Sequence, residues 1–433
     1  METKKPVTAI IVGGGHRSFT YAQLALDDPS ALKIVGIADP NPDRRKKAME
    51  MFGFNEEFCF ETAQQLAQVP KFADAVINGT MDHQHIETSL PLLEAGYDML
   101  LEKPFAVNIE EMQKLLQTVK KYGNKVMICH VLRYSPFYRS VKEKIRTGVL
   151  GDIINIQTSE FVSYHHLSTS YVRGKWGNSD LCKTSMLLAK CCHDIDILMW
   201  LMGDNKPATV SSFGSIFQFK PENAPEVAGT RCLVDCPLVD TCDFSAKKIY
   251  LEHPRRWAMY VWDALESLDH EPTLEDKANL LKNGSPYGKC IYKSGNNVVD
   301  HQSVLFNFSN GATATHNMVG GTARSTRTIH VVGTKGEMYG DFEGGTLHLQ
   351  TIETESPTGF KYEEVPLDTF SEDTHGGGDI GLIRDFVDYV RDNVQSVACT
   401  AIENSVAGHL AVFLADRSME QNGAPQTFDF STF

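Results

Sequence analysis

The fold is decided by the stretch Val7-Thr8-Ala9-Ile10-Ile11-Val12-Gly13-Gly14-Gly15, an apolar, β-rich run that ends in three glycines. A helical pattern follows over about 19–26, and a second apolar run, 32–37, leads into Asp39. This order is typical of a βαβ unit. The glycines allow a backbone to approach a pyrophosphate, and the start of the following helix supplies N–H groups. We therefore predict a dinucleotide site that includes Gly13, Gly15, His16 and Arg17.

Asp39 ends the second strand, where a carboxylate can accept hydrogen bonds from a ribose diol. It would repel a 2′-phosphate, so NAD is predicted as the cofactor rather than NADP. Arg44 lies close by and keeps that preference moderate. The third small position of the glycine pattern is Ser18 instead of glycine.

Strand and helix patterns continue to alternate, with strands over 72–78 and 125–129 and helices over 83–95 and 109–122. This alternation predicts an α/β fold with a doubly wound parallel sheet over residues 1–130. Residues 131–433 are expected to form a C-terminal α+β domain, because β alternation and turn signals from 302 onward indicate a largely antiparallel open sheet. Polar groups follow several strands, and the strand-end rule places them around one crevice: Gly13 to Gly15, Asp39, Thr80, Lys103 and His130.

Glu102 and Lys103 follow the apolar run 97–101, and Pro104 prevents regular continuation of the strand. A lysine held beside a ligand is desolvated, which lowers its pKa toward values useful for a general base. The alternative is a surface Glu–Lys pair at a strand exit. The βαβ pattern before it favours the functional interpretation.

A second chemical candidate lies in the helical run 186–202, where His193 and Asp196 are one turn apart and share a face. The carboxylate could set the tautomer of an imidazole that shuttles protons. The alternative is a histidine satisfied inside a packing face. Cys191 and Cys192 are interpreted as small packing residues.

The loop 164–176 combines imidazole, aromatic and cationic groups, which suits recognition of a sugar ring. Its candidate substrate-binding residues are His165, His166, Tyr171, Arg173 and Trp176. A packing loop is an equally good interpretation. Arg133 and Tyr134, after the last strand of the first domain, are further candidates, although Arg133 could instead pair with an acid.

Four motifs together resemble the Gfo/Idh/MocA oxidoreductase family: the glycine turn, Thr80-x-x-x-x-His85, Glu102-Lys103-Pro104 and His193-x-x-Asp196. The resemblance implies a nicotinamide dinucleotide cofactor, Lys103 at the reacting carbon, and an often cis Lys-Pro bond. It adds Thr80, His85 and Glu102 to the cofactor site and His375 to the substrate site, although Asp379 of the same segment could simply cap a helix. Many members carry an aspartate four residues before the histidine. Ala189 stands there in this chain, and Lys190 or Asp194 could replace the missing group.

An inserted region near 218–300 interrupts the resemblance. It holds Cys232, Cys236, Cys242 and Cys290, which could bind a structural zinc ion, although free packed thiols are the favoured interpretation. We therefore predict no metal. Residues 264–290 are polar and indicate an exposed, mobile excursion.

The bulk properties exclude several classes of protein. A formal net charge of -14 without a long basic run argues against nucleic-acid and membrane partners. Ten cysteines among 433 residues, with no export signal, indicate a cytoplasmic protein with free thiols. The C-terminal sheet is a candidate surface for homo-oligomer formation.

The sequence thus predicts an NAD-dependent oxidoreductase that moves a hydride between the nicotinamide and a hydroxyl carbon of a sugar, glycoside or polyol. Lys103 and His193 would be its acid/base groups, with Lys190 and Asp196 as further catalytic candidates. One alternative is a redox-neutral NAD-dependent glycosidase that oxidises, eliminates, hydrates and re-reduces its substrate. The other is a non-catalytic dinucleotide-binding regulator, which Ala189 favours.

Overall fold

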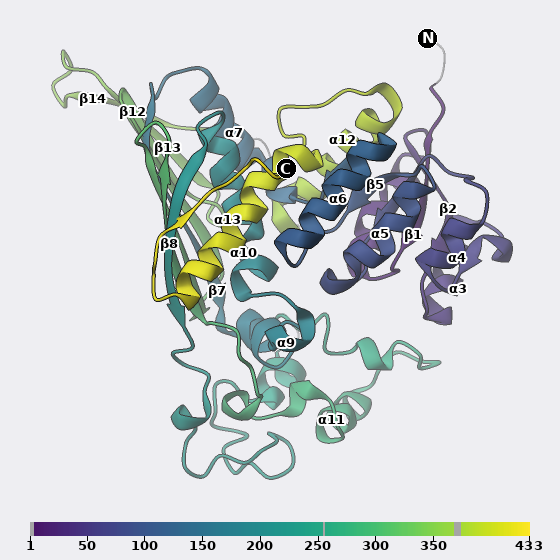
Figure 1. Ribbon diagram of the computed structural model, residues 1–433. Coiled ribbons are helices and arrows are strands. Elements are labelled where there is room, and N and C mark those ends of the chain that lie inside the picture. Colours follow the sequence, from purple (N-terminus) through teal and green to yellow (C-terminus); the bar gives the residue numbers. More distant parts are fainter. Residues whose placement is uncertain (1–3, 254–255, 368–373) are drawn as a thin grey trace.

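The computed structural model describes residues 4–253, 256–367 and 374–433. Two sheets lie side by side with helices between them, and the insertion lies below both (Figure 1). The strands are β1 Val7–Val12, β2 Leu32–Ala38, β3 Cys59–Phe60, β4 Ala75–Asn78, β5 Asp98–Leu101, β6 Val126–Ile128, β7 Ile153–Ser163, β8 Pro207–Ser215, β9 His301–Phe308, β10 Thr313–Thr322, β11 Thr326–Gly333, β12 Gly336–Asp341, β13 Thr346–Ile352, β14 Phe360–Glu364 and β15 Gln426–Thr427. The helices are α1 His16–Ala22, α2 Leu24–Asp27, α3 Pro42–Phe52, α4 Ala63–Gln68, α5 His85–Glu94, α6 Ile109–Tyr122, α7 Pro136–Arg146, α8 Tyr164–His166, α9 Ser179–Cys182, α10 Met186–Met202, α11 Leu274–Lys282, α12 Gly378–Asp392 and α13 Ile402–Glu420.

The first sheet is parallel throughout, with the strand order β3-β2-β1-β4-β5-β6. The order reverses direction at β1, which places a ligand crevice at the carboxyl ends of β1 and β4. Its helices begin and end where the sequence supplies caps: Asn108 caps α6, and Gly123 ends it in the left-handed conformation. The predicted Rossmann sheet is confirmed.

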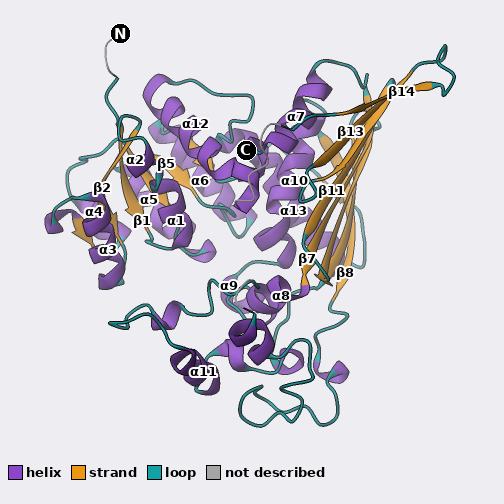
Figure 2. Cartoon of the chain, turned by 180° about the vertical axis from the view of Figure 1, so that it is seen from behind, coloured by secondary structure: helices purple, strands orange, loops and turns teal. Residues whose placement is uncertain are grey.

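The second sheet has nine strands in the order β14-β13-β12-β11-β7-β10-β9-β8-β15. Only β7 and β10 run parallel, so the expected largely antiparallel sheet is also confirmed. Buried residues alternate with exposed ones along β9 and with half-buried ones along β11, as they do in a sheet with one covered face. Helices α10 and α13 cover the face toward the first sheet (Figure 2).

Helix α12 returns to the first domain although it lies far along the chain. Leu382, Ile383 and Phe386 pack in the same apolar cluster as β1 and β2. Met127 of β6 also forms a bridge with Ala401. The division into 1–130 and 131–433 therefore remains a sequence-based prediction, with α12 packed across it.

The insertion forms a small packed unit that contains helix α11, while most residues of 264–280 are exposed, as expected. Its own apolar cluster joins Cys232, Ala246, Ile249, Tyr250, Val261, Leu281 and Tyr287. Helix α11 begins with a capping box in which Thr273 and Asp276 bond each other's backbone N–H groups. The polar composition of the insertion did not predict helix α11 or the apolar cluster, because a small cluster needs only a few apolar residues.

Within the described ranges, no helix is long and apolar enough to span a bilayer. All ten cysteines are free thiols.

Candidate active site

One cleft collects residues from both domains and from the insertion. The first domain supplies Gly15, His16, Arg17, Thr80, Asp82, Glu102 and Lys103; the second supplies His166, Tyr171, Lys175, Trp176, Lys190, His193 and His375; the insertion supplies Trp257, Met259 and Tyr260. The strand-end rule therefore places Gly15, Thr80 and Lys103 together as predicted. His130 lies instead in a buried ion pair away from this cleft.

The glycine turn is shaped for a close backbone approach. Gly13 has a φ of 77°, and a Cβ there would lie 2.9 Å from the backbone nitrogen of Thr80. A Cβ on Gly79 would lie 2.2 Å from Oγ of Ser18, which itself donates to the carbonyl oxygen of Gly13. Ser18 thus closes the contact between α1 and the β4 turn. Gly15 is open, with nothing nearer to a Cβ than 4.0 Å, so this turn fits a pyrophosphate.

Asp39 lies directly beneath this turn and is buried. Its Oδ2 accepts from the backbone N–H of Gly14 at 2.6 Å, and its Oδ1 accepts from Asn41 at 2.7 Å. The carboxylate therefore joins the turn to the loop after β2, which is the expected place for a ribose-binding acid. Arg44 stands one turn into α3, close to Gly14.

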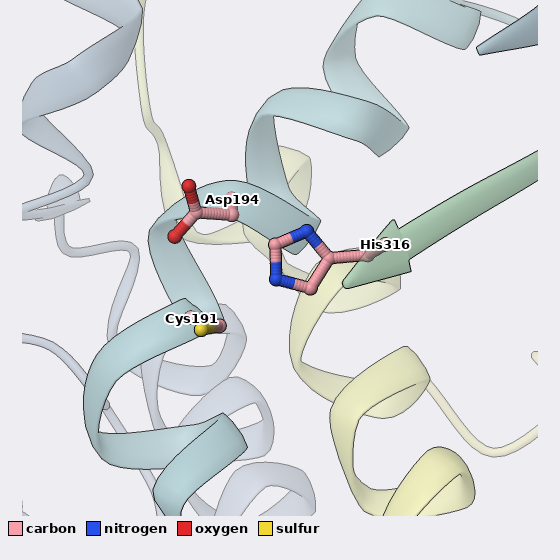
Figure 3. A group of neighbouring side chains, drawn as sticks. All are labelled: Cys191, Asp194 and His316. Carbon is pink, nitrogen blue, oxygen red and sulfur yellow. The ribbon is translucent and has the colours of Figure 1, made fainter. Parts of the chain in front are cut away.

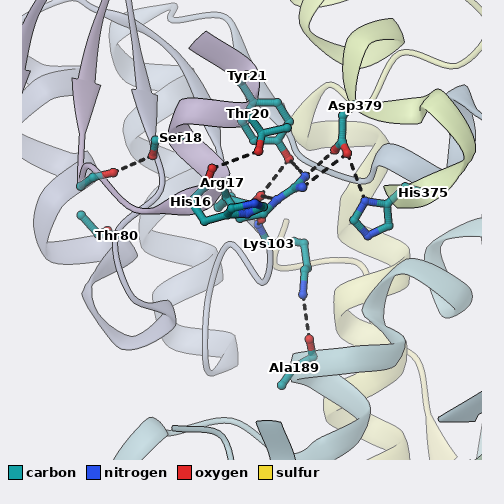
Figure 4. A network of polar contacts seen from close by, with 12 residues as sticks. His16, Arg17, Ser18, Thr20, Tyr21, Thr80, Lys103, Ala189, His375 and Asp379 are labelled. Atoms are coloured by element: carbon teal, nitrogen blue, oxygen red, sulfur yellow. Dashed lines mark hydrogen bonds and ion pairs between the residues drawn. The ribbon is translucent and has the colours of Figure 1, made fainter. Parts of the chain in front are cut away.

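A chain of charges joins the first strand exits to α12 (Figure 4). Arg17 Nε donates to Glu102 Oε1 at 2.9 Å, and its Nη2 donates to Asp379 Oδ1 at 2.5 Å. Tyr21 donates to the same Glu102 oxygen, and His375 contacts Asp379 at 3.3 Å. Asp379 is not the N-cap of α12, which is Gly377; it anchors the loop carrying His375 to the cofactor side of the cleft.

Lys103 follows β5 and reaches across the cleft. The Lys103–Pro104 bond is cis, and His85 contacts the carbonyl oxygens of Pro104 and Thr80 at 2.7 and 3.0 Å. His85 therefore supports the turn from behind and does not line the cleft. Lys103 Nζ donates to the main-chain oxygen of Ala189 on α10 at 2.7 Å.

The charge state of Lys103 differs from the sequence expectation. Burial lowers its pKa, but Cys192, Glu102 and other acidic groups around it more than offset that effect, so its pKa is raised. Within the protein alone, Lys103 is therefore an ammonium at neutral pH. This corrects the expectation that desolvation would lower the pKa of Lys103.

His193 has the opposite tendency. It is 5% exposed on α10, and burial together with the charge of Lys103 holds its pKa well below the usual range. Its ring lies 5.6 Å from that of His375, and its Nδ1 has no hydrogen-bond partner among the described residues. A neutral imidazole can accept a proton at its unprotonated ring nitrogen.

Asp196 does not serve His193 as expected. Its two oxygens accept from Arg133 Nε and Nη2 at 2.7 and 2.6 Å, and His130 Nδ1 lies 2.7 Å from Oδ1. The geometry is a buried bidentate pair, and these cations hold the pKa of Asp196 at about 2 against the effect of burial. The pairing therefore joins Arg133, which follows β6, to Asp196 on α10. Tyr134 likewise bonds Asp385 outside the cleft.

Lys190 lines the cleft but is tied to a second buried network. Its Nζ lies 3.0 Å from Glu160 Oε1, while Arg327 bonds Glu160 and Asp194 at 2.7 and 2.9 Å. Asp194 is thus held behind the cleft wall, away from a direct substrate contact. Lys190 could fill the place of the missing aspartate only by leaving Glu160.

Beside this network, Cys191, Asp194 and His316 lie close together (Figure 3), with donor atoms within 4.8 Å of one another. Burial raises the pKa of the Cys191 thiol well above its usual range and lowers that of His316 to about 4. A neutral thiol is a poor metal ligand, and Arg327 already supplies positive charge to Asp194. We interpret the group as core packing.

The four insertion cysteines do not form a zinc site in the described residues: no three of them bring their sulfur atoms within 4.8 Å of one another. Cys232 accepts from Arg173 at 3.7 Å. Arg173 also donates to the carbonyl oxygens of Lys289 and Phe244. It therefore fastens the insertion, as does His165, which accepts from the backbone N–H of Trp257 at 3.1 Å.

The substrate side of the cleft includes residues that sequence reasoning missed. Trp257 stacks on His166 with ring centroids 3.7 Å apart, and Lys175 lies 4.4 Å from the ring centre of Tyr260. Trp176 donates to Asp82 at 2.8 Å and so spans the two domains. The run Trp257-Ala-Met-Tyr260-Val-Trp262 was the available signal, since so many aromatic residues are unusual in a polar insertion.

Comparison with known proteins identifies the class. Residues 7–130 match the model described as "Oxidoreductase family, NAD-binding Rossmann fold", and residues 142–398 match "Oxidoreductase family, C-terminal alpha/beta domain". The chain belongs to the Gfo/Idh/MocA oxidoreductase family, and its first domain is an NAD(P)-binding Rossmann domain.

Individual relatives are distant. YteT of Bacillus subtilis, classed as an oxidoreductase, is 25% identical over 372 residues, or 82% of this chain and 81% of that protein. A 2,7-anhydro-N-acetylneuraminate hydratase of Mediterraneibacter gnavus is 23% identical over 49% of this chain and 54% of its own length. The structure of a levoglucosan dehydrogenase in complex with NADH superposes with a TM-score of 0.71 at 16% identity, covering 98% of this chain and 100% of the other.

Proposed function

We propose that this protein is an NAD-dependent dehydrogenase that oxidises a hydroxyl carbon of a sugar, glycoside or polyol. One observation carries the proposal: Lys103 from the first domain and His193 from the second line the same cleft beside the glycine turn. A nicotinamide dinucleotide held by its pyrophosphate at that turn would supply the hydride acceptor. The remaining chemistry is the removal of one proton and the stabilisation of one oxygen.

The pKa directions divide these two tasks. His193 has a lowered pKa and is neutral at pH 7, so it can take the hydroxyl proton. Lys103 has a raised pKa and remains an ammonium, so it holds the oxygen that becomes a carbonyl. In the reverse direction the same imidazole returns the proton. This division assigns the base to His193, where the sequence left the choice open.

The substrate class is supported by the wall opposite Lys103. Trp176, Trp257 and Tyr260 offer flat apolar faces, while His166, His375 and Lys175 offer polar groups around them. Alternating flat and polar surfaces match a carbohydrate ring, whose C–H faces are apolar and whose hydroxyls project outward. Relatives named for levoglucosan oxidation and anhydro-sugar hydration agree with this class.

The redox-neutral glycosidase is the second candidate, and the number of proton-transfer groups in the cleft favours it. A simple oxidation needs one base, whereas His166, His193 and His375 all line the cleft with lowered pKa values, in each case chiefly because they are buried. Elimination and hydration after oxidation would use additional bases. The hydratase relative also takes its name from a redox-neutral reaction.

A parallel screen separates these candidates. Sugars, polyols and aryl glycosides would be incubated with the protein and NAD, and NADH and released aglycone would be measured together. Stoichiometric NADH without aglycone supports the dehydrogenase, and aglycone without net NADH supports the glycosidase. NAD binding without either product would indicate the regulator and contradict both catalytic proposals.

Assembly and location remain proposals. We infer a homo-oligomer through the outward face of the nine-stranded sheet, which no helix of the described chain covers (Figure 2). Exposed Leu305 and Phe213 lie on its strands β9 and β8. Light scattering of the purified protein tests this, since a monomer would contradict it. A cytoplasmic location stays a prediction from the free cysteines.

A further inference from the structure

Cofactor choice in this chain is not decided by Asp39 alone. An acid after the second strand favours NAD, and an arginine in the same place accommodates the 2′-phosphate of NADP. This chain has both, since Arg44 follows Asp39 and its Cβ lies 3.3 Å from a Cβ built on Gly14. Both oxygens of Asp39 already accept backbone hydrogen bonds. The affinity for a 2′-phosphate therefore depends on whether the Arg44 guanidinium is free to bind it.

The Arg44 guanidinium forms an ion pair with Glu266, a residue far along the chain. Arg44 Nε and Nη2 donate to Glu266 Oε2 at 3.2 and 3.1 Å. Glu266 belongs to the insertion and follows a short helical turn, Asp263–Leu265. The pair joins the insertion to the first domain at the cofactor end of the cleft.

The segment 256–268, which carries Glu266, is held in place by independent contacts. The Trp257 backbone N–H donates to His165 at 3.1 Å, and its carbonyl oxygen accepts from Thr169 at 2.9 Å. Tyr260 then packs under Lys175. These contacts involve neither Arg44 nor a cofactor. They hold the segment so that the Glu266 carboxylate lies beside the Arg44 guanidinium in the protein alone.

We propose that Glu266 determines the preference for NAD over NADP by occupying Arg44. A 2′-phosphate would have to displace the Glu266 carboxylate or bind beside it. The negative charges of the phosphate and the carboxylate would then repel each other. The 2′-hydroxyl of NAD meets no such obstacle. The inference deepens the proposed function, on which it rests for the presence of a dinucleotide at the glycine turn.

Direct binding measurements test the inference without any sugar. Dissociation constants for NAD+ and NADP+ would be measured by calorimetry for the full chain and for Glu266→Gln. The matched control is Glu271→Gln, which removes the same charge from an exposed position of the same insertion. Because the pair is partly exposed, with side chains 30% and 43% accessible, the expected rise in relative NADP+ affinity is about three- to tenfold.

A second background shows whether Glu266 acts through Arg44. In Arg44→Ala, adding Glu266→Gln should leave the ratio of the two affinities unchanged. The inference is overturned if Glu266→Gln and Glu271→Gln give the same ratio, if the effect survives in Arg44→Ala, or if the unmodified protein binds NADP+ more tightly than NAD+. A sugar screen without turnover would end the dehydrogenase proposal while leaving these affinities measurable.

Discussion

Lys103 Nζ donates to the main-chain oxygen of Ala189 at 2.7 Å, which ties the end of β5 to α10 one turn before His193. A carbonyl oxygen orients the ammonium without neutralising it, so Lys103 keeps its full charge for a substrate oxygen. The main-chain oxygen of Ala189 is thus the group that holds the Lys103 ammonium within the protein.

Lys103→Met tests the electrostatic role of the ammonium. Removing the charge while keeping an unbranched side chain should lower kcat by about 10²- to 10³-fold, the size found for a lost oxyanion donor. NAD+ affinity should change little, since the glycine turn and Asp39 are untouched. Steady-state kinetics and calorimetry would be run on the same preparation. Unchanged turnover would remove Lys103 from the mechanism.

The pH profile of kcat/KM should report His193. Its pKa lies well below the usual range, so the base stays unprotonated and active at pH 6.5. Activity should therefore fall only at more acidic pH, as the imidazole gains a proton. His193→Asn should lower the rate by about 10²- to 10⁴-fold and abolish this acidic limb. An acidic limb that persists in His193→Asn would assign the base to another group.

Ala189→Asp would restore the family's usual residue. The new carboxylate would lie one turn before His193, and a nearby negative charge raises the pKa of an imidazole. The acidic limb should consequently move to higher pH by about one unit. Ala189→Asn is the matched control, because it adds similar volume without charge. Equal profiles for the two variants would contradict the assigned role of His193.

Asp196 should contribute stability through Arg133 and His130. Its pKa of about 2 is below the ordinary value of an aspartate, so the contribution is present above about pH 4 and is lost as pH falls toward the folded pKa. Asp196→Asn leaves Arg133 without a charged partner and should lower the free energy of unfolding by about 3–5 kcal/mol at pH 7.

The combined variant Arg133→Met with Asp196→Leu provides the comparison. It removes both charges from the buried site, so its loss should be smaller than that of Asp196→Asn alone. Urea denaturation at pH 7 measures all three proteins. A loss below about 1 kcal/mol for Asp196→Asn would show that the pair is not energetically important.

Sequence patterns predicted the fold correctly because the hydrophobic periodicity of a strand or helix can be recognised within a short segment of sequence. They also predicted that Lys103 and His193 belong to one site. The strand-end rule places Lys103 at the crevice, and the order of the family motifs adds His193. The partner of Asp196 was mistaken because α10 is buried on nearly every side, so sharing a helical face with His193 does not decide which neighbour the carboxylate meets. In the structure the Asp196 carboxylate pairs with Arg133, which donates two hydrogen bonds to it.

Long-range contacts account for what the sequence did not show. Glu266 and Arg44 are 222 positions apart, and no local period links them. Trp257 and Tyr260 belong to the insertion that interrupts the resemblance, yet they line the cleft. Such contacts depend on tertiary packing, which propensity and spacing do not encode.

The aromatic residues of the cleft supply a last prediction, because Trp257 lines the same cleft as Lys103 and His193. Trp257→Ala should remove a flat contact surface for the sugar and raise KM by about tenfold with a smaller change in kcat. Trp262→Ala is the matched control, since Trp262 packs in the insertion's own cluster near Lys277. Steady-state kinetics on the best substrate from the screen would compare them. If both variants raise KM equally, the effect belongs to folding of the insertion, and Trp257 is not a substrate contact.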